Sequence, residues 1–186
     1  MIVVGIDPSL TGTAVCRIEK EAVVVKRYTS KPAYGLADRI KRFADLAEHV
    51  VHIVGHDPDL VLIEGYSYGS SGGQAWDRIE YGGILRLRLV KQCRDVREVS
   101  PSTLKLFAAG HGHADKTVMA LAAYKRWGIE YTTDDEVDAY CLARFAEMLL
   151  GHSEPTNDGQ RRAVESILNP KVKVKKRRKQ TLGLEP

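Results

Sequence analysis

Residues 2–15, IVVGIDPSLTGTAV, contain the pattern that decides the fold. The stretch begins as an unbroken apolar run, which is typical of a strand buried on both faces of a sheet. The run ends at Asp7, and the turn residues PSLTG then lead into a second β-rich run. A carboxylate at the end of a buried strand is unfavourable unless it is paired or binds a metal. Asp7 is therefore the first candidate functional residue.

Two further acidic signals lie far from Asp7 in the sequence. Glu64 ends another apolar run, LVLIE, and Asp135 and Asp138 lie near the start of an expected helix, TDDEVDAYCLARF. Residues three apart share one face of a helix, so this pair can point toward one site. Carboxylates are ligands that Mg²⁺ prefers, and two ions about 3.5–4 Å apart are used by many enzymes that cleave phosphodiesters. The sequence therefore predicts one acidic site for two metal ions.

Each acidic signal also has a simpler explanation. Asp-Pro is common turn chemistry, so Asp7 could cap a turn. Acidic residues near a helix start, here Asp135 and Asp138, could simply stabilise the helix dipole. In the same segment, Thr133 or Asp134 could cap the helix, and we expect Asp134 to have no role beyond capping.

The remaining pattern predicts one mixed α/β domain. Five strands are expected at 2–7, 13–19, 22–29, 60–64 and 95–100, with Glu19-Lys20-Glu21 as the turn of a hairpin. Helices are expected at 36–54, 75–92, 101–109, 116–127 and 134–150. This order implies a five-stranded sheet whose first three strands are antiparallel, with helices on both faces. We expect a domain over residues 1–152 and a flexible, polar and basic C-terminal tail over 153–186.

The net charge of +4 is unevenly distributed. Residues 171–186 contain seven Lys and Arg side chains against Glu185 alone, so the rest of the chain is acidic overall. Such a block is attracted to polyanions, and we predict nucleic-acid contacts for it. The residues concerned are Lys175, Lys176, Arg177 and Arg178. A solvated tail or a nuclear-import signal would have the same composition.

Composition also limits where the protein acts. No window contains ~20 consecutive apolar residues, so no membrane span is expected. The chain starts directly in a strand, without the features of a secretion signal. Cys16, Cys93 and Cys141 are odd in number and widely spaced, which favours reduced, packed thiols. We expect a cytoplasmic protein of a bacterium or of a phage-infected host.

Four motifs, taken together, resemble one known family. GIDPSLTGTAV, VLIEGY, SPSTLKLFAAGHGHADK and DDEVDAYCLA occur in the order found in RuvC-type Holliday-junction resolvases of the RNase H-like superfamily, over roughly residues 1–150. The resemblance implies an RNase H-like fold and a homodimer that nicks opposing strands of a four-way DNA junction. It also implies dependence on Mg²⁺, for which Mn²⁺ can substitute, 5′-phosphate product ends, and no nucleotide cofactor.

The resemblance assigns roles to individual residues. The metal-binding catalytic carboxylates are Asp7, Glu64, Asp135 and Asp138. Lys105 and Lys116 match two lysines that contact DNA, and Lys116 is also assigned to catalysis.

The sequence departs from the family pattern in two places, and its compact first loop resembles phage-type versions. Ser9 stands where the family usually has Gly. Ser67 stands where family members carry a Phe that inserts at the crossover, and it is flanked by Tyr66 and Tyr68. We expect these two tyrosines, and with them Trp76, to stack on unpaired bases, although filling the core would explain them equally well.

Two features leave their role open. Gly82 and Gly83 interrupt an expected helix, where each is about 1 kcal/mol less favourable than Ala. Close approach of a partner subunit, of DNA or of the sheet would explain them. His111 and His113 could be metal ligands, a general acid or ordinary loop residues.

Three other functions share features with this sequence. An actin-like ATPase or sugar kinase has a similar first loop but needs two large lobes, for which this chain is too short. A looser nuclease that cuts forks and flaps remains an alternative. So does a non-catalytic junction-binding module, although carboxylates near phosphates are unfavourable unless a metal neutralises them.

Overall fold

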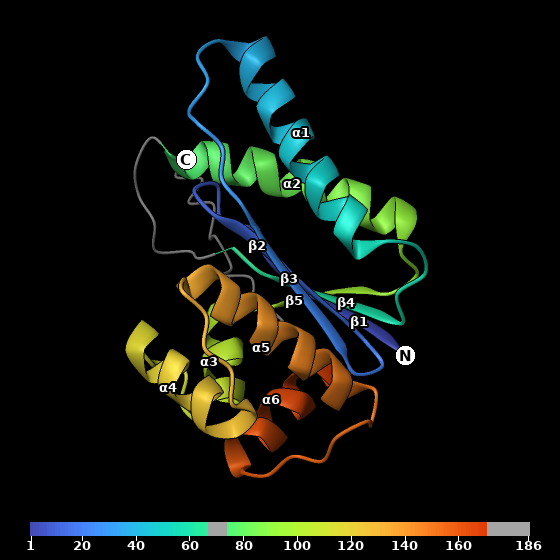
Figure 1. The fold of residues 1–186 in the computed structure, drawn as a ribbon, viewed down its shortest axis with the longest axis vertical. Helices are drawn as coiled ribbons and strands as arrows, with labels where there is room; N and C mark the ends of the chain where they lie inside the picture. The colour runs from blue at the N-terminus through green and yellow to red at the C-terminus, as the bar shows by residue number, and fades with distance from the viewer. Residues whose placement is uncertain (67–73, 171–186) are drawn as a thin grey trace, which may run out of the picture.

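A computed structural model describes residues 1–66 and 74–170, and its centre is a five-stranded sheet of order β3-β2-β1-β4-β5 (Figure 1). The strands are β1 (Ile2–Asp7), β2 (Thr13–Glu19), β3 (Ala22–Tyr28), β4 (Leu60–Glu64) and β5 (Val96–Val99). Strands β1, β2 and β3 are antiparallel, whereas β4 and β5 run parallel to β1. The predicted mixed sheet is therefore confirmed.

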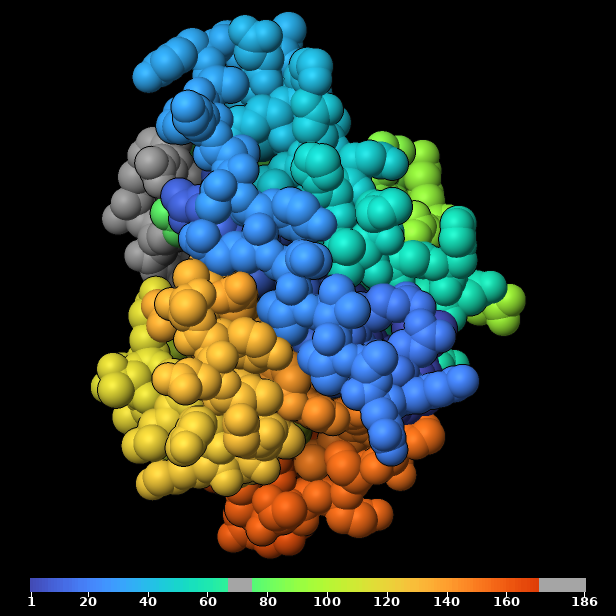
Figure 2. Space-filling view, viewed as in Figure 1, coloured from blue at the N-terminus to red at the C-terminus, as the bar shows by residue number. Residues whose placement is uncertain are grey.

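Helices cover both faces of this sheet (Figure 1). One face is covered by α1 (Leu36–Val54) and α2 (Gln74–Gln92). The opposite face is covered by α3 (Pro101–Ala109), α4 (Lys116–Trp127), α5 (Asp134–Leu149) and α6 (Asp158–Leu168). The β2–β3 hairpin lies between the two helical layers, and Figure 2 shows its outer strand β3 exposed there, whereas β2 is mostly buried. The loop of the hairpin is Lys20-Glu21, and Lys20 has a φ of 56°.

Strand β1 separates two hydrophobic clusters. Val4 and Ile6 face the α1–α2 layer, whereas Val3 faces the α5 layer, as the alternation of side chains along a strand requires. Gly5 also faces α5, and a Cβ there would lie 2.1 Å from the Ala139 carbonyl oxygen. The absence of a side chain lets α5 cross directly on the backbone of β1, close to the end of that strand.

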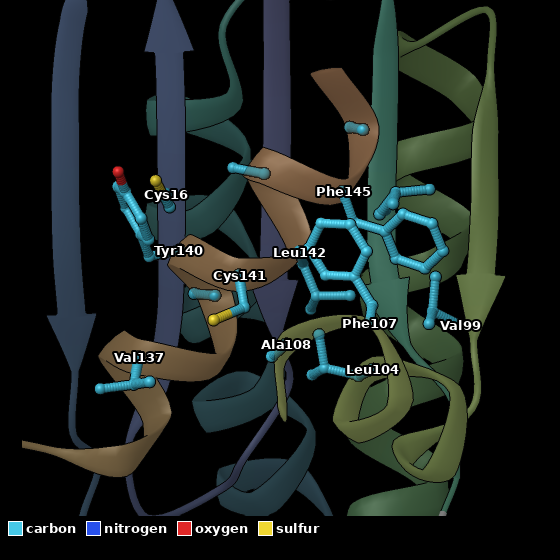
Figure 3. Packing of buried hydrophobic residues seen from close by; sticks show 14 of the residues in the cluster. Cys16, Val99, Leu104, Phe107, Ala108, Val137, Tyr140, Cys141, Leu142 and Phe145 are labelled. Carbon is cyan, nitrogen blue, oxygen red and sulfur yellow. The ribbon is translucent and has the colours of Figure 1, made fainter. Parts of the chain in front are cut away.

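The cluster beneath α5 is tightly packed (Figure 3). The rings of Phe107 on α3 and Phe145 on α5 are stacked, with centroids 4.3 Å apart. Arg126 of α4 donates hydrogen bonds to the carbonyl oxygens of Phe107 and Ala108 at the end of α3. These contacts fix α3 and α4 against α5, and the lysines that the sequence singled out lie on α3 and α4.

Helix α6 is the one helix of the described residues that the sequence did not predict. It lies within the segment expected to be a flexible tail and packs against α3. Asn157 caps it, and its Ala163 is fully buried. The proposed domain boundary at residue 152 stays a prediction, and residues 171–186 lie outside the described residues.

Two expectations about composition can be compared with the structure. Cys16, Cys93 and Cys141 are all free and buried, as predicted for packed thiols. Within residues 1–66 and 74–170, none of the helices combines the length and the apolar character needed to cross a membrane.

Candidate active site

A pocket of about 650 Å³ opens where β1 and β4 end. Asp7 is the last residue of β1 and Glu64 the last of β4, and the two strands are parallel neighbours with Ile6 opposite Ile63. Their carboxylates therefore reach the same edge of the sheet. Asp135 and Asp138 of α5 line the same pocket, so the structure brings together all four predicted carboxylates.

The start of α5 is fixed by a capping box. The Thr133 hydroxyl accepts a hydrogen bond from the Glu136 amide, and the Glu136 carboxylate accepts one from the Thr133 amide. Glu136 is thereby turned away from the pocket. The expectation that Asp134 only caps the helix is wrong, because Thr133 caps it and Asp134 lines the pocket and pairs with Lys116.

Burial and neighbouring carboxylates raise the pKa values of Asp7, Glu64 and Asp138. Burial raises the pKa of Asp7 well above its ordinary value, and the charges of Glu64, Asp138 and Asp135 raise it further. Burial, followed by the charge of Asp138, raises the pKa of Glu64 to about 7. Burial also raises the pKa of Asp138 to about 6, with Asp134 and Asp135 contributing. Negative charge is therefore in excess at this site.

Lysines offset only part of that charge. Lys105 of α3 lies close enough to lower the pKa of both Glu64 and Asp138. It lines a second pocket of about 220 Å³ that shares both carboxylates with the first. Lys116, the first residue of α4, lines both pockets, and its Nζ lies 2.7 Å from Asp134 Oδ2. This hydrogen bond raises the pKa of Lys116.

The donor set fits a hard divalent cation, although its side chains are not yet arranged around one. Among residues 1–66 and 74–170, no three His, Cys, Asp or Glu side chains are positioned to hold an ion. Asp135 instead accepts a hydrogen bond from Arg27 at 2.8 Å. Yet the four carboxylates that converge here are oxygen ligands, and burial and neighbouring carboxylates raise the pKa values of Asp7, Glu64 and Asp138, an effect that a bound cation would offset.

Tyr66 lines the first pocket but is already engaged in packing. The Arg86 guanidinium lies 4.3 Å from the centroid of its ring, and its hydroxyl donates to the Ile79 carbonyl oxygen at 3.2 Å. Stacking of Tyr66 on DNA stays a prediction. The second tyrosine, Tyr68, lies outside the described residues. The same holds for the four basic tail residues Lys175, Lys176, Arg177 and Arg178.

Sequence reasoning missed several residues that support this site. Arg86 donates a hydrogen bond to the Glu64 carbonyl oxygen at 2.9 Å, and Arg27 binds Asp135. Both arginines lie on predicted elements, but nothing in their local sequence indicates these partners. Conversely, His111 and His113 are exposed, and neither is among the described residues that line the two pockets.

Comparisons with known proteins found one matching family model and several relatives. The family model "Crossover junction endodeoxyribonuclease RuvC" matches residues 3–143. The RuvC of Mycolicibacterium vanbaalenii is 27% identical over 188 aligned residues, which cover 94% of this chain and 96% of the relative. The RuvC of Mycolicibacterium smegmatis is 28% identical over 154 residues, which cover 77% of this chain and 80% of the relative.

Solved structures of similar fold come from Thermus thermophilus. Its RuvC structure matches with a TM-score of 0.60 at 23% identity, covering 83% of this chain and 99% of that chain. The structure of T. thermophilus RuvC in complex with Holliday junction substrate matches with a TM-score of 0.62 at 22% identity and the same coverage. At this level of identity the likeness shows a shared fold, which is the RNase H-like fold that the sequence predicted.

Proposed function

The chain belongs to the RuvC family of crossover junction endodeoxyribonucleases, and from this premise we propose that it resolves Holliday junctions by cutting two opposing strands of a four-way DNA junction. The observation that carries the proposal is the convergence of four carboxylates from three distant segments on one pocket. A structural role does not explain this cluster, because mutual repulsion of buried carboxylates opposes folding.

The four carboxylates are proposed as the ligands of two Mg²⁺ ions, which Mn²⁺ can replace. Bound ions of this kind lower the pKa of the attacking water and stabilise both oxygens of an in-line displacement. Asp7 would hold metal together with the other three carboxylates, because burial and the charges of Glu64, Asp138 and Asp135 raise its pKa, and a bound cation would offset that repulsion.

The reaction is the hydrolysis of a phosphodiester bond. The water oxygen forms a bond to phosphorus, the bond to the 3′-oxygen breaks, and that oxygen takes up a proton. The products are a 5′-phosphate and a 3′-hydroxyl, which a ligase can seal. Lys116 is proposed to offset charge that develops on the phosphate, and Lys105 to contact DNA, because both line the pocket that contains Glu64 and Asp138.

The DNA surface extends beyond the pocket in this proposal. Tyr66 and Tyr68 lie next to Glu64 in the sequence and are proposed to contact unpaired bases. The basic tail, with Lys175, Lys176, Arg177 and Arg178, is proposed to contact phosphates. The DNA substrate and the free thiols support a cytosolic site of action.

The protein is also proposed to be a homodimer that pairs through α2. Trp76, Ile79, Leu87 and Val90 are exposed on this helix by 49–76%. Together with Gly83 they recur every three or four residues and so form one row, which we call the α2 stripe. A second copy can cover this stripe about a two-fold axis, as two symmetric nicks require.

Two rival functions make different predictions about the substrate. A looser nuclease would cut forks and flaps as fast as junctions. A non-catalytic module would bind junctions without cutting them, but the four carboxylates would then oppose the phosphates with no compensating gain.

Cleavage of a synthetic four-way junction in Mg²⁺ tests the proposal, with fork, flap and duplex DNA of the same sequence as controls. We expect paired, ligatable nicks in the junction and little cleavage of duplex. Equal rates on forks and flaps would favour the looser nuclease, and tight binding without nicks would favour the binding module. A protein that neither binds nor cuts the junction would contradict the proposed function.

A further inference from the structure

Arg27 joins three segments that are distant in the sequence. It lies on β3, opposite Ala14 of β2. Its Nε donates a hydrogen bond to Asp135 Oδ2 of α5 at 2.8 Å, and its Nη2 donates to the Thr11 carbonyl oxygen at 3.3 Å. Thr11 belongs to the loop that follows Asp7. One guanidinium therefore binds Asp135, which is a proposed metal ligand, and also the backbone of the loop beside Asp7, a second proposed ligand.

Gly12 makes this contact possible. A Cβ at position 12 would lie 2.1 Å from Arg27 Nη2 and 2.2 Å from Asp135 Oδ2, distances that no packed atoms adopt. The ion pair thus passes directly over the backbone of residue 12. Gly12 is required here by close approach, since it is not among the glycines with positive φ.

Only one member of this ion pair, Asp135, lines the pocket. The side chains of Arg27 and Asp135 are 29% and 21% exposed, so water screens this ion pair less than the fully exposed pairs on α1 and α6. Asp135 lines the pocket, whereas Arg27 is not among the described residues that line it. Arg27 therefore binds one carboxylate oxygen, Oδ2, of a residue that lines the pocket, without lining the pocket itself.

Arginine is suited to such a task. Its planar fork remains charged at all relevant pH values and can hold two acceptors in fixed directions. Partners that hold a metal ligand from outside typically change metal affinity by 10–100-fold when they are removed. Here the fork holds a carboxylate oxygen and a carbonyl oxygen, and this fixes the direction of Asp135 relative to the loop of Asp7.

We propose that Arg27 is a positioning residue, which orients Asp135 for metal binding and ties α5 to the loop that follows Asp7. The proposal rests on the proposed function, because it takes Asp135 as a metal ligand. The opposite role is that Arg27 competes with the cation for Asp135. The two roles differ in sign: loss of a positioning residue weakens metal binding, whereas loss of a competitor strengthens it.

The test compares Arg27→Met and Arg27→Lys with wild type. Arg17→Met on the neighbouring strand is the matched control, because Arg17 contacts Glu19 and the Val54 carbonyl oxygen but none of the four carboxylates. Binding of Mn²⁺ to the DNA-free protein is measured by electron paramagnetic resonance, which counts the free aqueous ion. The Mg²⁺ concentration for half-maximal junction cleavage is measured in parallel.

We expect Arg27→Met to weaken Mn²⁺ binding by about 10–100-fold and to raise the Mg²⁺ requirement by a similar factor. Cleavage should recover at saturating Mg²⁺. Arg27→Lys should fall between Arg27→Met and wild type, and Arg17→Met should leave Mn²⁺ binding unchanged even where it lowers the melting temperature. Unchanged or tighter Mn²⁺ binding in Arg27→Met would overturn the positioning role.

Two further variants keep the test decisive. If Arg27→Met does not fold, the effect of Arg27→Lys is measured alone and again in an Asp135→Asn background. A positioning role acting through Asp135 predicts that the Lys effect disappears there, and an effect of the same size in both backgrounds would contradict it. Failure of wild type to bind Mn²⁺ would instead count against the proposed metal site, so the two failures can be distinguished.

Discussion

Helices α2 and α5 cover opposite faces of the sheet and differ in how much of their surface is buried. Ten of the 16 residues of α5 are buried, and its first turns supply Asp135 and Asp138 to the pocket. Helix α2 buries the row Tyr81, Leu85 and Leu89 and exposes the α2 stripe on its outer face. A helix with two apolar rows has a second surface available for a partner. The proposed metal ligands thus lie on α5 and at the ends of β1 and β4, whereas the proposed association surface lies on α2.

Helix α2 nevertheless supports the site from behind. The Tyr81 hydroxyl lies 2.9 Å from Thr13 Oγ1, which in turn donates to the Ser9 carbonyl oxygen. Arg86 of the same helix holds the Glu64 carbonyl oxygen. These bonds fix the backbone beside two proposed ligands, although none of the four proposed carboxylate ligands lies on α2. Helix α5 therefore supplies proposed ligands, whereas α2 fixes the backbone next to the ligands on β1 and β4.

The largest effect should come from changing a proposed metal ligand, with a carboxylate on α2 as the control. Asp7→Asn keeps the shape of a proposed ligand but removes its charge, and several kcal/mol of stabilisation by the metal corresponds to a loss of cleavage on the order of 10³-fold. Junction binding should persist or tighten, because a negative charge near phosphate is removed. Single-turnover cleavage and a gel-shift affinity measure both quantities.

The matched control is Asp77→Asn on α2. Asp77 lies 3.9 Å from Arg39 and does not line either pocket as described. We expect cleavage within a few-fold of wild type. Retention of cleavage by Asp7→Asn within tenfold would remove Asp7 from the mechanism and with it the contrast with α2.

The two adjacent glycines of α2 divide between its two faces. A Cβ on Gly82 would lie 2.6 Å from the Tyr66 hydroxyl, whereas a Cβ on Gly83 would meet nothing within 4 Å. Gly82→Ala should therefore destabilise the fold by about 1–3 kcal/mol through overpacking. Gly83→Ala should stabilise it by up to about 1 kcal/mol through helix propensity. Urea unfolding gives the free energy of unfolding of both variants. Equal changes in the two variants would show that the two faces of α2 do not differ in packing.

Association is tested by Leu87→Ser in the α2 stripe. Removing an apolar side chain from the interface should weaken the dimer by about tenfold or more, while the fold of each subunit is kept. Leu121→Ser on α4 is the control, because Leu121 is similarly exposed, at 49% against 54%. Sedimentation at several protein concentrations decides the matter. A wild-type protein that stays monomeric on junction DNA would leave paired nicking without support.

The raised pKa values of the carboxylates that line the pocket predict a pH effect on stability. Glu64 and Asp138 bind protons more tightly in the folded than in the unfolded chain, since their folded pKa values are about 7 and about 6. Without metal, the free energy of unfolding should fall as pH rises from about 4.3, the ordinary carboxyl value, to about 7. Saturating Mg²⁺ should abolish the fall, because the ions bind the ionised carboxylates.

Melting temperatures measured between pH 4.5 and 7.5, with and without Mg²⁺, check this prediction. Each kcal/mol corresponds to a shift of about 2–4 °C for a chain of this size. Glu64→Gln should flatten the metal-free profile. A profile that rises between pH 4.5 and 7 without metal would show that the carboxylates are not mutually destabilising.

The local sequence predicted those features that depend on residues close together in the chain, such as the ends of strands and the starts of helices. The strand ends at Asp7 and Glu64 and the helix starts at Pro101 and Lys116 all occur where periodicity and turn residues indicated. The family resemblance added which of the acidic residues near the start of α5 to choose. Both kinds of signal lie in short, contiguous stretches of sequence.

Contacts between distant segments could not be predicted in this way. Arg27 and Asp135 are 108 positions apart, and nothing near either residue indicates the other. The roles of Gly82 and Gly83 depend on which neighbour packs on each, which the tertiary structure alone decides. Helix α6 was missed because its single apolar row is short and lies in a polar region, so its stability comes from packing on α3.

The smallest effect on catalysis should come from deleting residues 171–186, which follow α6 and belong to neither α2 nor α5. The segment carries seven basic side chains, and contacts to phosphate position a protein without reading branching. Deletion should therefore weaken junction and duplex binding by similar factors. It should reduce the slope of log K against log salt by about 0.9 for each phosphate that the tail neutralises in the full-length protein, while cleavage at saturating protein stays nearly unchanged. Salt titrations of both proteins on both DNAs measure this. A fall in junction affinity that spares duplex affinity would show that the tail recognises branching, and selectivity would then not reside in the two helical layers alone.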